Sequence, residues 1–403
     1  MRLIFIRNVA GRAATFTCVL AAVLTASAPI ISQDVFAQVS LPTVNTSSWV
    51  LIDVSSMQTL ASANANKRVE PASLTKLMTA YLVFDMLKTK KISMEQMVIP
   101  SQSVYQMHTD ESRMFIEAQK PVTVHDLVYG MIVQSGNDAA IVLAELIGGS
   151  EVNFVRMMNE TAQKLGMKNT HYADVSGMPH SLHYTSAADL ALLSAHLMLD
   201  YPEYYSIFAV KDFTYNKIKQ LNRNRLLWID PTVDGVKTGY TKAAGYCLIA
   251  SAKRLLPGAS GVPRRLLSVI MGELKEHDRT QDSLNMLNYG YTAYDMIRLY
   301  TANQIISSPR VYKSQKYTVP VGVKKDQYIT VPHGMGDRVL SVLECYHPLV
   351  SPITNGQVVG TVKVIVGDKV LKKFPAIALQ TAPEAGIFRR LLDTVLLMFA
   401  KKT

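Results

Sequence analysis

The pattern of hydrophobic and polar positions predicts a large domain in which helices lie between strands. Apolar runs of strand length lie at 48–54, 232–236, 245–253 and 265–272. Apolar runs of helical length lie at 77–87, 123–146, 151–168, 185–198 and 278–300. Strands near both ends with helices between them predict an α+β (α/β) fold, with one antiparallel sheet covered by helices on two faces. We expect this domain to span 38–304.

The pattern changes between 305 and 381 to short alternating runs punctuated by Gly and Pro. Such runs predict a small all-β domain. Gly367 and Asp368 separate two of the runs and predict a hairpin turn. The segment has no cluster of candidate catalytic residues, so we expect a spacer or, alternatively, a binding module.

The first 37 residues predict a targeting segment. Three arginines precede an apolar stretch over 13–31, and residues 35–37 (Val-Phe-Ala) offer a small-residue cleavage site. We therefore expect a signal peptide at 1–37 and an exported protein. The apolar stretch is also long enough for the alternative, an uncleaved membrane anchor.

Residues 384–403 predict an amphipathic helix. When successive residues are placed 100° apart, six apolar side chains share one face: Phe388, Leu391, Leu392, Val395, Leu396 and Phe399. Arg389, Arg390, Asp393 and Lys401 lie opposite, and Leu397 is the exception. These charges make it costly to span a bilayer, so we expect the helix to lie on the membrane surface as a peripheral anchor. The alternative is a helix packed against its own protein.

Composition narrows the function classes. The formal charge is +11, but the basic residues are scattered and no nucleic-acid motif accompanies them, so we expect anionic cell-wall or lipid groups as partners and no nucleic acid. Cys18 leaves with the signal segment. Cys247 and Cys345 fall in different predicted domains, which favours two buried thiols over a disulfide. No Cys/His cluster has metal spacing and no Gly-rich phosphate loop is present, so no metal and no cofactor are expected.

Ser73 and Lys76 form the first candidate catalytic motif. Pro71 suits the start of a helix, and an apolar helical run follows at 77–87. Ser73 is therefore expected in the first helical turn, where free backbone N–H groups favour developing negative charge. The i, i+3 spacing places the Lys76 amine beside the Ser73 hydroxyl, as an activated serine requires. Alone, the pattern also fits a capping serine and a solvated lysine.

Two further motifs follow in order, Ser135-Gly136-Asn137 between two helical segments and Lys237-Thr238-Gly239 after a strand-like run. With Ser73-Leu74-Thr75-Lys76, the set resembles that of the penicillin-recognising serine acyl-transferases, which carry Ser-x-x-Lys, Ser-x-Asn and Lys-Thr-Gly motifs in this order. The resemblance covers nearly all of the predicted mature chain. It implies a penicillin-binding/β-lactamase-like fold for the large domain.

Lys76 can accept the Ser73 proton only if its amine is neutral, although an ordinary lysine has a pKa of about 10.4. Burial and the charge of Lys237 would both lower that pKa. Ser135 can relay the proton to the leaving amine, and Asn137 can bond the substrate amide. Lys237 and Thr238 can hold a substrate carboxylate.

The resemblance also implies that the backbone amides of Ser73 and Tyr240 form the oxyanion hole, next to Gly239. It implies a carboxylate-binding role for Arg223 and, with less support, for Arg279. For both arginines the alternative is an ordinary surface position.

The family contains several hydrolases. A class A β-lactamase needs a glutamate in a Glu-x-x-x-Asn context between the second and third motifs, and none is present, so fast β-lactam hydrolysis is not expected. The motifs, the β domain and the terminal helix together resemble the low-molecular-mass penicillin-binding proteins that are D-alanyl-D-alanine carboxypeptidases. Ser176 is a departure, because a histidine is common at that position in the family, which puts deacylation or substrate preference in doubt.

This resemblance implies a serine D,D-carboxypeptidase that removes the terminal D-alanine from peptidoglycan pentapeptide stems, is inhibited by β-lactams and works at the periplasmic face of a bacterial inner membrane. One alternative is a D,D-endopeptidase that cuts cross-links with the same residues. The other is a non-catalytic wall-binding or scaffolding protein that retains the motifs. The sequence makes no prediction of oligomeric state.

Overall fold

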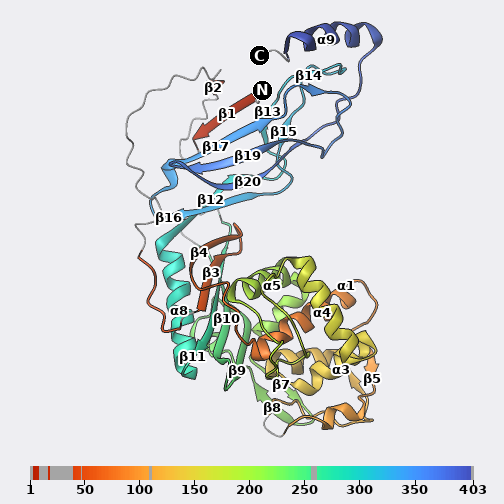
Figure 1. Cartoon of the computed structure of the whole chain (residues 1–403), viewed down its shortest axis with the longest axis vertical. Coiled ribbons are helices and arrows are strands. Elements are labelled where there is room, and N and C mark those ends of the chain that lie inside the picture. The colour runs from red at the N-terminus through yellow and green to blue at the C-terminus, as the bar shows by residue number, and fades with distance from the viewer. Residues whose placement is uncertain are drawn as a thin grey trace. The chain divides into compact units, whose positions relative to one another are not determined.

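The computed structural model describes residues 3–8, 17–18, 40–46, 48–108, 111–255 and 261–400. It divides into two compact units (Figure 1). The first is Leu41–Tyr291, and the second is Thr292–Thr403 with the described part of the amino-terminal segment. Each unit has its own hydrophobic core, and each is described separately.

The first unit is built on a five-stranded antiparallel sheet in the order β4-β3-β11-β10-β9. Its strands are β3 (Ser48–Asp53), β4 (Gln58–Ala63), β9 (Val233–Thr241), β10 (Gly245–Arg254) and β11 (Arg264–Glu273). All six residues of β3 are buried. Val50 and Ile52 face one core, whereas Trp49 and Leu51 face the other. Because successive strand residues point to opposite faces, both faces of the sheet are covered, as the sequence predicted.

The helices fall into two groups, one on each face of the sheet (Figure 1). The smaller core includes side chains of α7 and α8, and the larger core includes side chains of α1 to α6. The helices are α1 (Lys76–Lys88), α2 (Val124–Tyr129), α3 (Asn137–Gly148), α4 (Glu151–Leu165), α5 (Ala187–Asp200), α6 (Pro202–Tyr205), α7 (Leu226–Ile229) and α8 (Glu276–Ala293). Nine of the thirteen residues of α1 are buried, so α1 is the enclosed helix around which the others pack.

Short elements complete the first unit. Two hairpins pair β5 (Met97–Val98) with β6 (Val122–Thr123) and β7 (Asp212–Tyr215) with β8 (Ile218–Leu221). The 3₁₀ turns are Ala72–Thr75, Gln102–Tyr105 and Ser206–Ala209, and Gly130–Gln134 is a π-helical turn.

The helix predicted over 278–300 is wrong for its last seven residues, 294–300. Helix α8 ends at Ala293, and β12 (Tyr294–Tyr300) pairs with β16 (Gln327–Pro332) of the second unit. Helix α8 continues through Gly290 without a break. A Cβ at this position would lie 2.7 Å from Leu266 Cδ1 and 2.8 Å from Leu51 Cδ2, so the glycine lets α8 pack closely on the sheet.

The second unit is mainly β structure. Its larger sheet has the order β13-β15-β20-β19-β17-β1-β2. The strands of this sheet are β1 (Leu3–Asn8), β2 (Thr17–Cys18), β13 (Ile305–Ser307), β15 (Val321–Gly322), β17 (Val339–Cys345), β19 (Val358–Val366) and β20 (Lys369–Ala378). A separate parallel pair is formed by β14 (Val311–Tyr312) and β18 (Leu349–Val350). The 3₁₀ turn Gly336–Arg338 precedes β17. Val366 pairs with Lys369 across Gly367 and Asp368, which confirms the predicted hairpin.

The ends of the chain bear on two predictions. Most of the predicted signal segment lies outside the described residues, and its cleavage site does too. Helix α9 (Ile387–Ala400) confirms the predicted carboxyl-terminal helix. Among the described residues, no helix combines the length and hydrophobicity needed to cross a membrane. Cys247 and Cys345 are both buried free thiols, as predicted.

Candidate active site

Ser73 and Lys76 meet where a 3₁₀ turn enters the buried helix α1. Ser73 lies in the turn Ala72–Thr75, and Lys76 is the first residue of α1. The predicted helix start is therefore shifted by one tight turn. The Lys76 amine lies 3.0 Å from Ser73 Oγ and 2.8 Å from the carbonyl oxygen of Ser176. Only 2% of Lys76 is exposed, so its amine has protein groups as partners in place of bulk water.

Burial lowers the pKa of Lys76 to about 7. The positive charge of Arg223 also contributes to this lower pKa, while the carboxylates of Asp174, Glu111 and Asp138 oppose it. A large fraction of Lys76 is therefore neutral near pH 7. A neutral amine has the lone pair that a general base requires.

The second motif follows an unusual π-helical turn. The π-helical turn Gly130–Gln134 ends at Ser135, which has a left-handed backbone with φ of 69°. Helix α3 then begins at Asn137. In the part of the chain that the structure describes, the buried atoms Ser135 Oγ and Asn137 Oδ1 have no hydrogen-bond partner. Buried polar atoms without partners are rare, so this pair is suited to bind a ligand.

Asp138 fastens the neighbouring chain to this motif. Its carboxylate accepts hydrogen bonds from the backbone N–H groups of Met114 and Ile116, at 3.0 and 3.1 Å. Burial raises the pKa of Asp138, and the backbone donors oppose that rise. The fastened segment brings Glu111 within hydrogen-bond distance of the Asn137 side-chain amide.

The third motif lies on β9, which is an edge strand of the sheet. Lys237 and Thr238 are buried. A Cβ on Gly239 would lie 3.0 Å from the carbonyl oxygen of Pro71 and 3.2 Å from Leu74 Cγ. The glycine therefore allows β9 to lie directly against the Ser73 turn. An unpaired strand edge at this point can accept an extended peptide.

Positive charge is concentrated beside β9. Burial holds the pKa of the Lys237 amine well below its usual range, and the charges of Lys76, Arg223 and Arg279 lower it further. Arg279, only 4% exposed, donates to the Gly239 carbonyl at 3.4 Å and pairs with Glu276 at 3.0 Å. Because Arg279 is buried, the alternative of an ordinary surface arginine is wrong for this residue.

Arg223 is placed by the two asparagines beside it. Asn222 and Asn224 are buried and bond to the backbone, with Asn222 donating to the Val210 carbonyl and Asn224 to the Gly235 carbonyl. These bonds fix the backbone on both sides of Arg223. The arginine side chain lies at the cavity, where it is exposed.

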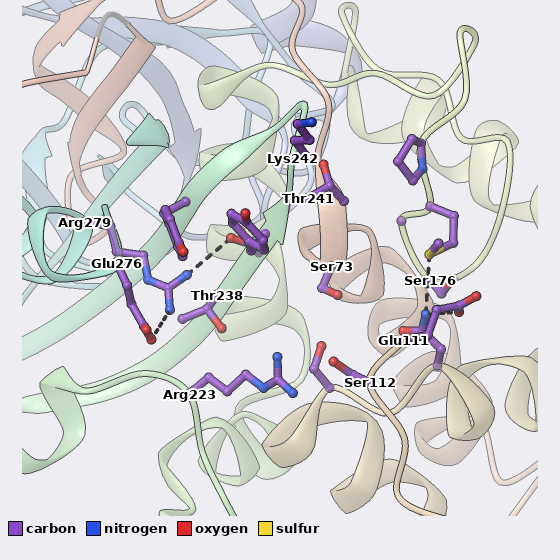
Figure 2. A pocket seen from close by; sticks show the side chains of 18 residues that line it. Ser73, Glu111, Ser112, Ser176, Arg223, Thr238, Thr241, Lys242, Glu276 and Arg279 are labelled. Carbon is purple, nitrogen blue, oxygen red and sulfur yellow. Dashed lines mark hydrogen bonds and ion pairs between the residues drawn. The ribbon is translucent and has the colours of Figure 1, made fainter. Parts of the chain in front are cut away.

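The three motifs converge on one cavity of about 570 Å³. Eight of the ten predicted site residues line it: Ser73, Ser135, Asn137, Arg223, Thr238, Gly239, Tyr240 and Arg279. Lys76 reaches the cavity through Ser73, and Lys237 is buried next to Thr238. In Figure 2, Ser73 lies between a side that carries Arg223, Thr238 and Arg279 and a side that carries Glu111 and Ser176.

Several lining residues were not predicted from the sequence. They are Glu111, Ser112, Gly177, Met178, Pro179, Thr241, Lys242, Tyr246 and Glu276. Glu111 and Ser112 are brought to the site by Asp138, which bonds the backbone that follows them. In the sequence, Asp138 is only the residue after the second motif, and its partners could not be predicted. The stacked rings of Tyr240 and Tyr246, 4.2 Å apart, follow from the β9–β10 register.

The loop 174–178 closes the cavity against the Ser73 turn. Gly177 has φ of 99°, and a Cβ there would lie 1.8 Å from the carbonyl oxygen of Ala72. Ser176, at the position where the family commonly has histidine, contributes its backbone carbonyl to Lys76, while its hydroxyl donates to Asp174 at 3.1 Å. At position 176 the backbone, and not the side chain, contacts Lys76.

A serine on a 3₁₀ turn beside the buried lysine that begins α1, framed by the other two motifs, is the arrangement of a penicillin-recognising serine acyl-transferase. Two family models match the chain, one described as D-alanyl-D-alanine carboxypeptidase (residues 35–274) and one as penicillin-binding protein 5, C-terminal domain (residues 294–384). The chain belongs to the D-alanyl-D-alanine carboxypeptidase family and is a serine-type enzyme of that class, which confirms the predicted family, fold class and activity.

Individual relatives agree with this assignment. D-alanyl-D-alanine carboxypeptidase DacA of Haemophilus influenzae is 38% identical over 372 residues, covering 91% of this chain and 93% of that protein. The crystal structure of penicillin binding protein 5 from Haemophilus influenzae aligns with a TM-score of 0.80 at 39% identity, covering 86% of this chain and 100% of that one. Penicillin-binding protein D2 from Listeria monocytogenes, in its ampicillin-bound form, aligns with a TM-score of 0.55 at 29% identity, covering 62% of this chain and 99% of that one.

Replacing Gly177 by alanine tests the contact between the loop and the serine turn. The added Cβ would meet a backbone atom of Ala72, so the loop must move away from the turn. We expect acylation by a labelled penicillin to slow by about 100-fold, the order of loss that a displacement of 1 Å causes. Stopped-flow fluorescence measures the rate.

Gly149→Ala is the matched control. Gly149 also has a positive φ, of 72°, but no atom lies within 4 Å of an added Cβ. We expect this variant to lose about 1–3 kcal/mol of stability from backbone strain and to acylate at the normal rate. Equal acylation rates in the two variants would contradict the role given to the Gly177 contact.

Proposed function

We propose that this enzyme removes the terminal D-alanine from peptidoglycan pentapeptide stems through an acyl-enzyme on Ser73. The observation that carries the proposal is the 3.0 Å contact between Ser73 Oγ and the buried amine of Lys76. That contact lies at a cavity with a cationic side, which suits a peptide that ends in a free carboxylate.

In the acylation step, Ser73 Oγ attacks the carbonyl carbon of the penultimate D-alanine. Lys76 takes the hydroxyl proton as the new ester bond forms, and the backbone N–H groups of Ser73 and Tyr240 stabilise the oxyanion. Ser135 donates its hydroxyl proton to the nitrogen of the departing residue and takes the proton held by Lys76 in its place, so Lys76 becomes neutral again. The peptide bond then breaks and D-alanine leaves as a neutral amine with its own carboxylate.

In the deacylation step, water replaces the lost amine. Lys76 accepts a proton from that water, the hydroxide attacks the ester, and the proton returns to Ser73 Oγ. The shortened stem leaves as a new carboxylic acid, which ionises in water and releases the remaining proton. The Lys76 amine is then neutral, as it was at the start, so the cycle closes.

The remaining residues position the substrate. Lys237, Thr238, Arg223 and Arg279 bind the terminal carboxylate, which places the scissile carbonyl over Ser73. The side-chain amide of Asn137 bonds the peptide backbone, and Gly239 keeps β9 close enough to pair with it. A β-lactam fits the same arrangement because it also presents a strained amide and a carboxylate, and the ampicillin-bound relative supports this.

Two alternatives use the same residues. A D,D-endopeptidase would bind cross-linked stems and release stem fragments without free D-alanine. A scaffold would bind wall or penicillin without forming a covalent adduct. The buried Lys76, whose pKa of about 7 leaves a large fraction of the amine neutral, favours catalysis over scaffolding, because a charged surface lysine would serve a scaffold equally well.

We also propose that the enzyme works outside the cytoplasm on the surface of the inner membrane, held there by α9. The support is the way in which α9 lies on its own unit. Asp393 is 4% exposed and accepts a hydrogen bond from the Lys313 backbone, and Arg389 donates to the Gln315 carbonyl at 3.0 Å. The polar face is therefore the face that packs on the protein.

The apolar face of α9 is left exposed, with Phe388 at 91%. Its other exposed apolar side chains are Ile387, Leu391, Leu392, Val395, Leu396 and Met398. A helix that served only to pack against its own protein would bury its apolar face. The exposed apolar face of α9 therefore opposes that alternative. Each such side chain transferred fully from water contributes about 1.5–3 kcal/mol, and several of them suffice to hold a protein on a lipid surface.

Ser73→Ala is expected to abolish both reactions while leaving the fold intact, because the nucleophile is lost and Ser73 is only half-buried. Mass spectrometry after incubation with penicillin should show an adduct on Ser73 in the native enzyme and none in the variant. Native enzyme given a pentapeptide stem should release one D-alanine per stem. An adduct on another residue, or release of stem fragments from cross-linked dimers alone, would contradict the proposal.

Leu391→Glu/Val395→Glu is expected to release the enzyme from vesicles that contain anionic lipid, because both charges would enter the apolar boundary. Cosedimentation measures binding, and penicillin labelling shows whether the active site persists. Val152→Glu/Leu274→Glu adds the same charge at two exposed apolar positions of the other unit and should still bind. Vesicle binding that survives the α9 substitutions would place the anchor elsewhere.

A further inference from the structure

We propose that Asp174 and His183 form a positioning pair that holds the Ser176 carbonyl on Lys76 and so orients the amine toward Ser73. The inference rests on the roles proposed above for Ser73 and Lys76. Neither Asp174 nor His183 belongs to the three motifs, and neither lines the cavity. Both therefore act through other groups and do not touch the substrate.

The pair is tied to the start of α1. His183 Nδ1 lies 3.0 Å from Asp174 Oδ2, and His183 Nε2 lies 2.8 Å from Thr75 Oγ1. The His183 side chain is 1% exposed, so these partners are not exchanged for water. Because Thr75 is the residue before Lys76, the histidine joins the loop 174–178 to the turn that carries both catalytic groups.

Asp174 organises the loop itself. One of its oxygens accepts hydrogen bonds from the N–H groups of Ser176 and Gly177, both at 2.6 Å, and the other accepts from Met178 at 3.0 Å. Burial raises the pKa of Asp174, but the bonds from His183, Gly177 and Ser176 outweigh it and hold the pKa at about 2. The carboxylate therefore remains ionised at any working pH and fixes three consecutive backbone groups.

The Ser176 carbonyl determines how the Lys76 amine is turned. A neutral amine has two N–H donors and one lone pair. When one N–H is donated to the Ser176 oxygen at 2.8 Å, the lone pair can face the Ser73 hydroxyl at 3.0 Å. Without a fixed acceptor the amine could rotate about its last bond and present an N–H to Ser73, which is the wrong polarity for a base.

Two other contacts hold the loop at the same place. Thr79 donates to the Val175 carbonyl at 2.9 Å, and Gly177 packs against Ala72. Loss of the Asp174–His183 pair should therefore shift the Ser176 carbonyl without releasing the whole loop. This separates a positioning role from a purely structural one.

Charge gives a second, independent readout. The groups that act on the Lys76 amine are Asp174, Arg223, Glu111 and Asp138, and the charge of Lys76 in turn lowers the pKa of Lys237. Asp174 is the carboxylate with the largest effect, and it raises the pKa of Lys76 against the effect of burial. His183 faces Asp174, Thr75 and the edge of the Tyr172 ring. Removing the Asp174 charge should lower the pKa of Lys76.

The test measures acylation of the full-length enzyme by a fluorescent penicillin across neutral pH, with unfolding temperatures recorded in parallel. His183→Ala should lower the maximum acylation rate by about 10- to 100-fold. His183→Gln should recover most of that loss, because an amide can bond to both Asp174 and Thr75. Asp174→Asn should slow acylation and move the rise of rate with pH to lower pH.

His196→Ala is the matched control. It removes another Asp–His pair of the same unit, in which His196 Nδ1 lies 2.9 Å from Asp200. We expect native rates and a native pH midpoint. If His183→Ala does not fold, the pH midpoint of Asp174→Asn and the rate of His183→Gln decide the question.

The proposal would be overturned by native acylation rates in folded His183→Ala, or by an unchanged pH midpoint in Asp174→Asn. Lower stability with native rates would assign the pair to the fold alone. Failure of the native enzyme to acylate would instead overturn the proposed function, and this inference with it. The two failures are therefore distinguishable.

Discussion

The rest of the site depends on keeping the Lys76 amine out of water beside Ser73. An ammonium is costly to bury, so removing it from solvent lowers its pKa to about 7 and creates a base from a side chain that is ordinarily a cation. This constraint accounts for the buried position of α1 at the centre of the large unit. A helix of the same sequence on the surface would carry a charged lysine and an unactivated serine.

Three separate parts of the chain close around that amine. Edge strand β9 lies against the serine turn because Gly239 has no side chain. In the second motif Ser135 has a left-handed backbone, and its buried hydroxyl has no partner among the described residues. The loop 174–178 supplies the carbonyl that orients the amine. The loop approaches so closely that one added carbon at Gly177 would collide with the serine turn. The site is thus rigid on the side of the base and open on the side of the substrate.

The sequence predicts the catalytic motifs well because their chemistry is local. Ser73 and Lys76 are three residues apart on one turn, and the other two motifs have equally short spacing. Long-range contacts were not predictable in this way. Thr75 and His183 lie 108 positions apart, and nothing local marks His183 as a partner of the serine turn. The predicted helix over 278–300 failed for the same reason, since residues 294–300 become a strand only by pairing with distant β16.

The titration of Lys76 in the native enzyme tests the central claim most directly. With lysine labelled at its side-chain carbon next to the amine, NMR follows each amine as pH is raised, and Lys76→Met and Lys237→Met assign the two buried signals. The account predicts that the Lys76 signal titrates near pH 7, about three units below the surface lysines. A Lys76 signal that titrates with the surface lysines would contradict the account, because Ser73 would then have no neutral amine to take its proton.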